Sequence, residues 1–375
     1  MVHVFAGTKA QLIKMAPVMV LLRGRGIAFR YVDSGQHAET SRSLRRVFGL
    51  PEPDVRLGDR AGEIVSIPQA VAWAARNAWR GLAHPAWLRE EVFPGGGICL
   101  IHGDTLSTLL GLRMARRAGL KVAHVEAGLR SFRTWDPFPE ELIRIHCMRR
   151  ADVLFAPSDE AAGNLRRMNV PGRVVQVQGN TVADALRLVD GVPTGLDLPD
   201  EPFALATCHR LETITSKRRL RRVVALLNRL AERLAVVFVT HRPTRRALRR
   251  FGLEEGLNRR ITTLGMLDYG DFVALQKAAR LVVTDGGSIQ EECAYLNKPC
   301  LIIRGATERP DGLGSNAALW AHDDRVVEAL LAKAASETPT GPAELPRPSA
   351  EIVDTLVRLG YAEAADPDGP AEERP

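Results

Sequence analysis

The chain has 375 residues, of which 45% are hydrophobic and 25% are charged, a composition typical of a globular protein large enough for two domains. No apolar run reaches the length of a membrane span and no secretory signal opens the chain, so we expect a cytoplasmic protein with no membrane partner. The five cysteines are odd in number and lack CxxC spacing, which argues against a disulfide framework or a zinc site.

The net charge of +7 comes mainly from arginine, which greatly outnumbers lysine. Such a skew indicates a coding bias more than a binding surface. Arginines cluster at 217–222 and 242–250, where apolar residues separate them on predicted helices. This pattern favours solvated helix faces over a nucleic-acid footprint. We therefore expect no nucleic-acid partner.

The first half of the chain alternates short apolar runs with helical segments. Each run predicts a buried strand of a parallel sheet. Polar residues and glycines follow the runs directly, at the strand ends where open α/β sheets bind ligands. The predicted strands are Val2–Phe5, Phe29–Val32, Ile98–Ile101, Val122–Val125, Val153–Ala156 and Val174–Val177.

A segment rich in Pro, Gly and Asp at 190–202 predicts a linker, after which the alternation restarts. Two such series joined by one linker predict an α/β protein with two Rossmann-like domains, 1–188 and 200–345, facing each other. The strands of the second series are predicted at Phe203–Thr207, Val236–Thr240, Ile261–Leu264, Leu281–Thr284 and Cys300–Ile303.

The stretch from His102 to Arg144 concentrates the side chains suited to acid–base chemistry. Its carboxylates include Asp104, Glu126, Glu140 and Glu141. Asp104 and Glu126 stand just past two predicted strands. Glu140 and Arg144 are four residues apart on one helical face, and spacing alone favours a surface ion pair.

Two further positions have simpler interpretations. Lys14 lies in the first turns of the helix after the first strand, where it would contact a phosphate or face solvent, with neither favoured. Ser288 and Glu291 have the spacing of a capping box and predict a helix that starts beside Ser288.

Nine motifs occur in a specific order along the chain: GTKAQLIKMAP, SGQH, HGDTLST, HVEAGLRS, PFPEELIR, GNTVADAL, CHRLET, TDGGSIQEE and ATERPDG. In their order and spacing, residues 1–320 resemble the non-hydrolysing UDP-N-acetylglucosamine 2-epimerases. The resemblance implies a GT-B type fold, in which the two domains bind a UDP-sugar in the cleft between them. It also implies a homodimer, no metal and no cofactor, and a C-terminal helix at 349–361 that packs back on the first domain.

The resemblance also implies roles for individual residues. The catalytic positions are Asp104, Glu126, Glu140, Arg144 and His209. The substrate-binding positions are Lys9, Lys14, His37, Arg210, His241, Phe272, Gly286, Gly287, Ser288, Glu292 and Arg309. Two turns depart from the family pattern. Lys9 and Gln11 replace an Arg and a Glu, and Ser288 follows two glycines where the family has the serine first.

The activity implied by the resemblance interconverts UDP-GlcNAc and UDP-ManNAc. Elimination of UDP would give a 2-acetamidoglucal, and UDP would then add back while C2 is protonated on the opposite face. This route needs a carboxylate base, an acid on the other face and cations beside the diphosphate. The alternatives are a hydrolysing 2-epimerase that releases UDP and ManNAc, a GT-B glycosyltransferase and a non-catalytic sugar-nucleotide sensor. The group of carboxylates argues against the last two.

Overall fold

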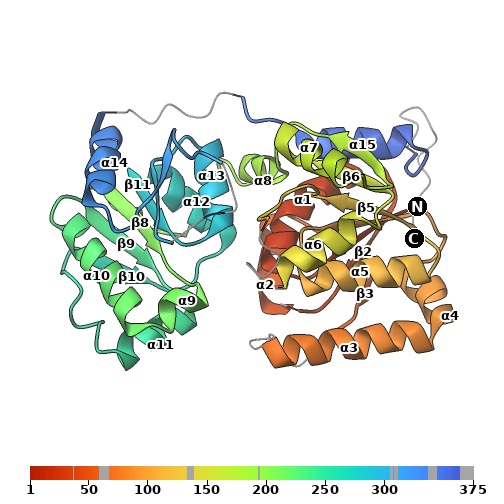
Figure 1. Ribbon diagram of the computed structural model, residues 1–375, viewed down its shortest axis with the longest axis horizontal. Helices are drawn as coiled ribbons and strands as arrows, with labels where there is room; N and C mark the ends of the chain where they lie inside the picture. The colour runs from red at the N-terminus through yellow and green to blue at the C-terminus, as the bar shows by residue number, and fades with distance from the viewer. Residues whose placement is uncertain are drawn as a thin grey trace. The chain divides into compact units, whose positions relative to one another are not determined.

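The computed structural model describes residues 1–36, 38–58, 67–132, 139–192, 195–304, 307, 311–336 and 344–363. The chain divides into two compact units, Met1–Leu188 with Pro346–Pro375, and Val189–Leu345. Each unit contains one parallel sheet with helices packed against it (Figure 1). The predicted α/β class is confirmed.

The sheet of the first unit has seven strands in the order β3-β2-β1-β4-β5-β6-β7, all parallel. Strands β1 and β4 are completely buried, as expected for a sheet covered on both faces. The short edge strand β3 is not predicted by the sequence. The strands are β1 (Val2–Ala6), β2 (Phe29–Asp33), β3 (Val55–Arg56), β4 (Ile98–His102), β5 (Lys121–Val125), β6 (Val153–Ala156) and β7 (Arg173–Gln176).

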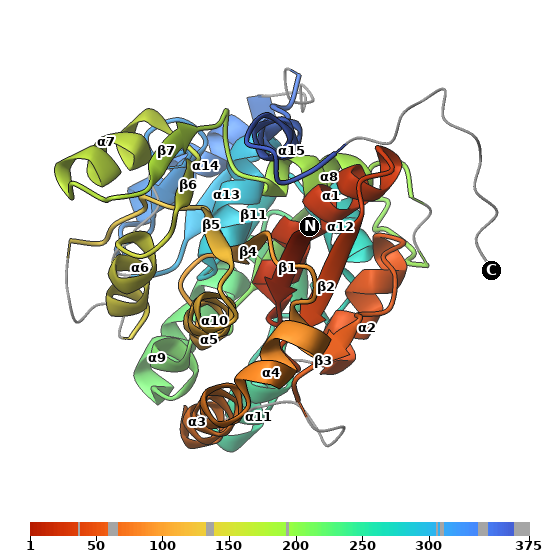
Figure 2. The same cartoon turned by 90° about the vertical axis from the view of Figure 1, so that its right-hand side faces the viewer.

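Two groups of helices cover this sheet (Figure 2). Helix α1 contacts α2, α8 and α15 in one group, and α5 contacts α3 and α6 in the other. Helices α1, α5 and α7 start at Thr8, Thr105 and Ser158, whose hydroxyls accept backbone N–H groups of the first turn. The bounds are α1 (Lys9–Gly24), α2 (Ala38–Val47), α3 (Ile67–Ala83), α4 (Pro85–Trp87), η1 (Leu88–Val92), α5 (Leu106–Arg117), α6 (Glu140–Met148), α7 (Asp159–Arg167), α8 (Val182–Leu188) and α15 (Pro348–Arg358).

Helix α15 joins the first unit although it comes last in the chain. Its apolar residues Ile352, Val353 and Leu356 are fully buried, and it contacts α1 and α8. The Asp184 carboxylate accepts the backbone N–H of Ser349 at 2.8 Å, so it caps the start of α15 from α8. The C-terminal helix is therefore attached by apolar burial and by a specific polar contact.

The sheet of the second unit has six parallel strands in the order β10-β9-β8-β11-β12-β13. They are β8 (Phe203–Thr207), β9 (Ala235–Val239), β10 (Ile261–Leu264), β11 (Leu281–Thr284), β12 (Cys300–Ile302) and β13 (Ala317–Leu319), the last of which the sequence does not predict. The helices are α9 (Leu211–Ile214), α10 (Lys217–Ala231), α11 (Arg242–Arg250), α12 (Tyr269–Ala278), α13 (Gly287–Tyr295) and α14 (Asp324–Ser336).

The capping box predicted from Ser288 and Glu291 is wrong. Helix α13 begins at Gly287, and its N-cap is Gly286, which makes no side-chain capping bond. The strand β11 ends at Thr284, as predicted, but only Asp285 and Gly286 separate it from α13. Ser288 therefore lies inside the first turn of α13.

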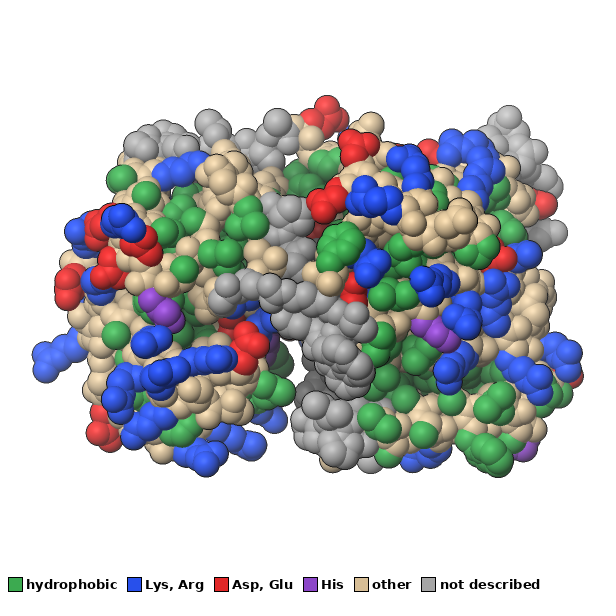
Figure 3. Space-filling view, viewed as in Figure 1, with side chains coloured by type: hydrophobic (Ala, Val, Ile, Leu, Met, Phe, Trp, Pro, Cys, Tyr) green, Lys and Arg blue, Asp and Glu red, His purple; other side chains and the backbone are tan. Residues whose placement is uncertain are grey.

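The arginines of α10 and α11 lie on exposed faces, and Figure 3 shows Lys and Arg side chains gathered over this part of the second unit. Arg229 and Arg233 form ion pairs with Asp324 and Glu328 of α14, each at 2.6 Å. Within the described ranges, no helix is long and apolar enough to cross a membrane.

The turn after β5 depends on Gly128, and this gives a first prediction. Gly128 has φ +93° and a Cβ at this position would collide with the Ala161 carbonyl oxygen of α7. We expect Gly128→Ala to lower the free energy of unfolding by about 2 kcal/mol or more, measured by urea denaturation. Gly163→Ala is the matched control, because Gly163 is inside α7 and an added methyl would meet only the end of the Arg167 side chain at 3.6 Å. There we expect a gain of about 0.5–1 kcal/mol. Equal effects at the two sites would contradict the packing argument.

Candidate active site

The turns after β1 and β4 are joined by the side chain of Gln11. Its Oε1 accepts the backbone N–H groups of Gly7 and Thr8, both at 3.2 Å. Its Nε2 donates to the His102 carbonyl and to Thr108 Oγ1, both at 2.9 Å. Gln11 is 1% exposed, and the donor and acceptor ends of its amide are both used. The residue that departs from the family pattern therefore ties together two strand ends of the sheet.

Glu126, which follows β5, has an unusual backbone and a buried side chain. Its φ is +62°, in the left-handed region that a residue with a side chain seldom adopts, and it is 8% exposed. Its Oε2 accepts hydrogen bonds from Lys14 Nζ and Asn180 Nδ2. His102 Nε2 lies 3.6 Å from the same oxygen. The carboxylate thus accepts hydrogen bonds from α1 and from the turn before α8, and the His102 ring lies close to it.

Lys14 is only 2% exposed and is paired with Glu126, so the solvent-facing alternative is wrong. The sequence does not reveal that Lys14 is buried. Helix α1 is apolar around most of its circumference, so the pattern of residues does not distinguish a buried face from an exposed one. A lysine in such a helix is buried together with its neighbours, and it needs an anionic partner there.

Arg144 joins two carboxylates. Its Nη1 donates to Glu141 Oε2 at 2.9 Å, and its Nη2 donates to Asp104 Oδ2. Glu141 is completely buried and also accepts Arg130 Nε at 2.5 Å and the Ser131 backbone N–H at 3.2 Å. Burial alone would raise the pKa of Glu141, but the donors Arg130 and Ser131 and the charge of Arg144 hold that pKa below its ordinary value.

The surface ion pair predicted between Glu140 and Arg144 is wrong. Arg144 is 6% exposed and uses Glu141, three residues earlier, with Asp104. Glu141 is therefore a site residue that the sequence analysis missed, and its i, i+3 spacing to Arg144 was the available signal. Glu140 is the first residue of α6 and is half-buried. Among the residues that the structure describes, no donor is within hydrogen-bonding distance of its Oε2.

His124 supports the turn after β4 from the neighbouring strand β5. Its Nε2 lies 2.7 Å from the Gly103 carbonyl oxygen. In the tautomer that carries the proton on Nε2, the ring donates a hydrogen bond to this oxygen. The side chain is fully buried, and this desolvation lowers the pKa of His124 to about 4. His124 is therefore uncharged at neutral pH and acts as a neutral donor beside the Asp104 turn.

In the second unit, the ends of β8 and β11 are held together by Asp285. This carboxylate is completely buried and accepts the backbone N–H groups of His209 and Arg210 at 3.0 and 2.9 Å. Cys208 Sγ lies 3.3 Å from it, and His209 Nδ1 lies at 3.2 Å. The sequence analysis did not single out Asp285 as a site residue, although its place at the end of a central strand was a usable signal.

The neighbouring residues pack closely around His209. The His241 ring, which follows β9, lies with its centroid 5.0 Å from that of His209. A Cβ on Gly286 would come within 3.1 Å of His209 Cε1, so a larger residue here would make a tight contact with the ring. Gly286 and Gly287 open helix α13, whose N-terminus is suited to an anion.

The remaining predicted residues are placed as follows. Glu292 is 3% exposed and accepts the Tyr269 hydroxyl at 3.1 Å. Phe272 of α12 is partly buried against the core of the second unit. Lys9 is the first residue of α1 and is partly exposed. His37 and Arg309 lie outside the described residues.

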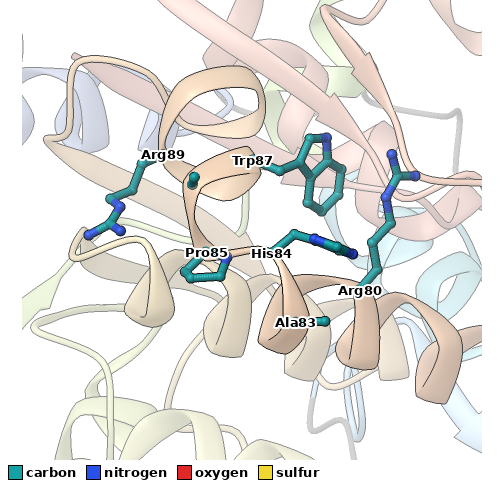
Figure 4. Close-up of a pocket in the computed structure, with 7 residues that line it drawn as sticks. Arg80, Ala83, His84, Pro85, Trp87 and Arg89 are labelled. Carbon is teal, nitrogen blue, oxygen red and sulfur yellow. The ribbon is translucent and has the colours of Figure 1, made fainter.

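A surface pocket of about 520 Å³ lies at the junction of α3 and α4 (Figure 4). The Arg80 guanidinium lies 4.1 Å from the ring centroid of Trp87, and His84, Pro85 and Arg89 complete the rim. The lining includes no carboxylate and no residue of the turns after β1, β4 or β5. This pocket is therefore separate from the candidate site.

Both sheets thus carry their reactive groups at the carboxyl ends of parallel strands. The first unit presents carboxylates with cations, and the second presents histidines and a helix N-terminus. This arrangement is typical of an α/β enzyme and is suited to an anionic ligand. Within the described part of the chain, no three His, Cys, Asp or Glu side chains form a group suited to a metal ion.

Comparison with known proteins identifies the family. The family model described as UDP-N-acetylglucosamine 2-epimerase matches residues 21–345, so the chain belongs to this family and is a sugar-nucleotide epimerase. It is 32% identical to the UDP-N-acetylglucosamine 2-epimerase of Bacillus subtilis over 340 residues, covering 87% of this chain and 84% of that protein. It is 29% identical to the Methanocaldococcus jannaschii enzyme of the same name over 353 residues, covering 87% and 90%.

A third relative is named for a different sugar. The UDP-2,3-diacetamido-2,3-dideoxy-D-glucuronate 2-epimerase of Pseudomonas aeruginosa is 29% identical over 332 residues, covering 86% of this chain and 89% of that protein. Among solved structures, the Methanocaldococcus jannaschii UDP-GlcNAc 2-epimerase in complex with UDP-GlcNAc and UDP superposes with a TM-score of 0.76 at 25% identity, over 96% and 99% of the two chains. The family and the GT-B type fold expected from the motifs are confirmed.

The buried histidines predict how stability depends on pH. Burial lowers the pKa of both His3 and His124 to about 4, whereas both titrate near 6.5 in the unfolded chain. The unfolded chain therefore binds more protons between these values, and stability is lost as the pH falls from about 6.5 towards 4. We expect His124→Gln, which keeps a donor for the Gly103 carbonyl, to remove about 2 kcal/mol of the loss between pH 8 and pH 5. Urea unfolding at both pH values measures this. An unchanged difference would show that His124 is not buried in its neutral form.

Proposed function

We propose that the protein is a non-hydrolysing UDP-N-acetylglucosamine 2-epimerase that interconverts UDP-GlcNAc and UDP-ManNAc. Its family membership supports a 2-epimerase, and the carboxylates at the ends of β4 and β5 support acid–base chemistry at C2. The observation that carries the proposal is that the three carboxylates Asp104, Glu126 and Glu140 have different environments. Glu126 is surrounded by donors, Asp104 is bound to Arg144, and Glu140 has an oxygen without a donor among the described residues.

The proposed reaction begins with loss of the C2 proton to a carboxylate. The C2–H electrons form the C1=C2 double bond, and UDP leaves C1 with the electron pair of the C–O bond. In the return step a UDP oxygen adds to C1 while a second carboxylic acid protonates C2 on the opposite face. We assign the two proton transfers to Glu126 and Glu140. Glu140 can exchange a proton at Oε2 without breaking a hydrogen bond to a described residue, and Glu126 is held in one orientation.

The other residues of the two units would bind the nucleotide and support the departing charge. Arg144 is held by Glu141 and Asp104, so it offers a fixed cation. In the second unit we propose that UDP is bound by His209, Arg210, His241, Phe272, Gly286, Gly287, Ser288 and Glu292. Lys9 is a candidate for the diphosphate, and His37 and Arg309 remain predicted contacts.

One experiment separates the candidate activities. The protein is incubated with UDP-GlcNAc in deuterium oxide and the products are followed by NMR. UDP-ManNAc with deuterium at C2 is the expected result. Free ManNAc with UDP would indicate the hydrolysing reaction, and no turnover without an added acceptor would indicate a glycosyltransferase. A parallel run with UDP-2,3-diacetamido-2,3-dideoxy-D-glucuronate tests whether this chain prefers the sugar for which the Pseudomonas aeruginosa relative is named.

The role of Glu140 gives a specific prediction. Glu140→Gln should lower kcat by about 100-fold or more, because the amide cannot transfer a proton to C2. The free energy of unfolding should change little, since Oε2 makes no hydrogen bond to the described residues. The control is Glu160→Gln in the first turn of α7, an exposed glutamate that should leave kcat unchanged. Glu140→Gln with wild-type kcat and C2 exchange would assign the proton transfer to another residue.

We also propose a homodimer, formed through the exposed face of α3. Val71, Trp79 and Leu82 are 54%, 73% and 59% exposed, although the opposite face of the helix buries Trp73. They lie on one side of the helix with Ala75 between them. An exposed tryptophan within an apolar stripe is typical of the centre of an interface, and a second copy supplies an identical apolar face.

The dimer is tested by the double variant Trp79→Glu/Leu82→Glu. We expect the wild type to sediment as a dimer and the double variant as a monomer, because four added carboxylates would face one another across the two-fold axis. Met266→Glu is the control, since Met266 is an exposed apolar residue of the second unit, at 54%. A wild type that is monomeric at micromolar concentration, or a dimeric double variant, would exclude this interface.

A further inference from the structure

Lys14 lies where it can pair with a carboxylate of the protein itself. Its side chain comes from the first turns of α1 and is 2% exposed, and its Nζ donates to Glu126 Oε2. Burial of an ammonium group carries a large desolvation penalty unless an anion is beside it. Glu126 provides that anion. A lysine whose charge is already matched inside the protein is poorly suited to act as a substrate phosphate contact.

Asn180 reaches the same carboxylate oxygen from the turn before α8. It is 4% exposed, and its Nδ2 donates to Glu126 Oε2. Its Oδ1 accepts the backbone N–H of Val182 at 3.3 Å, which orients the amide so that the nitrogen faces Glu126. Lys14 and Asn180 therefore hold Oε2 from two different elements.

The backbone of Glu126 is also fixed on both sides. The Val125 carbonyl accepts the Gly103 N–H at 3.2 Å, and the Ala127 N–H donates to the Phe155 carbonyl at 2.9 Å. These bonds to β4 and β6 keep Glu126 at φ +62°, a conformation that is strained for a residue with a side chain. Strain of this kind persists at sites where the direction of a side chain matters.

We propose that Lys14 and Asn180 are positioning residues that clamp the carboxylate of Glu126 for proton transfer at C2, and that Lys14 does not bind the substrate. This inference rests on the proposed epimerase function. It assigns Lys14 a different role from Lys9, the other lysine of α1, which is partly exposed at the start of the helix. His102 Nε2, 3.6 Å from the same oxygen, is a further titratable group that faces the clamp.

The two lysines are compared by steady-state kinetics. Lys14→Met should lower kcat by about 100-fold with less than about a threefold change in KM, because a mispositioned base affects the chemical step. Lys9→Met should mainly raise KM. Lys14→Arg, which keeps the charge, should recover at least about tenfold of the lost kcat. The matched control is Lys121→Met, which should behave as wild type. Lys121 is the exposed first residue of β5, the strand that leads to Glu126.

A phosphate contact would give the opposite pattern. If Lys14→Met raised KM and weakened UDP binding in calorimetry while kcat stayed within about threefold, the positioning role would be excluded. UDP affinity also serves as a check on folding, because a misfolded variant would lose it together with kcat. The clamp requires kcat to fall while UDP still binds.

Asn180 is tested with two changes, of which only Asn180→Asp is isosteric. Asn180→Ala removes the donor, and Asn180→Asp replaces it with a carboxylate that repels Glu126. We expect kcat to fall in both, and to fall further in Asn180→Asp than in Asn180→Ala. Equal kcat in the two variants would mean that Asn180 fills space only, and would overturn its part in the clamp.

A double-mutant cycle tests the pairing independently of turnover. Unfolding is measured for Lys14→Met, Glu126→Gln and the double variant. The clamp predicts strongly non-additive effects, because either single change leaves a buried charge unmatched and the double change does not. Additive effects would overturn the pairing. If the wild type failed to epimerise UDP-GlcNAc, the proposed function would fall, and this cycle would still decide whether Lys14 holds Glu126.

Discussion

Glu126 and Glu141 are buried carboxylates at the carboxyl end of the first sheet, and each would be strongly destabilising without a donor or cation beside it. This requirement arranges the site. Glu141 accepts Arg130 and Arg144, and Arg144 in turn holds Asp104, which is more exposed. Removing Glu141 would therefore release the arginine and, through it, the aspartate. The exposed groups are ordered by the buried ones, as preorganised catalysis requires.

The second unit meets the same requirement with backbone groups in place of cations. Asp285 is as deeply buried as Glu141, but its donors include the main-chain N–H groups of His209 and Arg210. The buried carboxylate thus fixes the backbone of the turn after β8. A cationic partner would have fixed the position of only one side chain. The first unit fixes charged side chains in relation to one another. The second fixes a loop that carries His209 against a helix N-terminus opened by Gly286.

Local patterns were enough to predict the alternation of strands and helices and the carboxylates that follow β4 and β5. Apolar runs with polar ends are typical of parallel strands, and this signal does not depend on distant residues. The partners of the charged groups could not be predicted in this way. Arg144 reaches Asp104 because of the direction in which α6 meets the Asp104 turn, and Lys14 is buried because α1 is covered by α8 and α15. The start of α13 was misplaced although β11 has the predicted bounds, because Gly286 is the N-cap and makes no side-chain capping bond that a capping-box pattern could reveal.

The departure at Gln11 becomes understandable within this arrangement. A glutamate at this position could accept the Gly7 and Thr8 N–H groups as Gln11 does, but an ionised glutamate could not donate to the His102 carbonyl or to Thr108. The amide therefore adds a tether between the turn that precedes α1 and the turn that carries Asp104. Since α1 also carries Lys14, the tether fixes the position of the lysine relative to the β4 end of the sheet. The substitution thus adds support beneath the carboxylates.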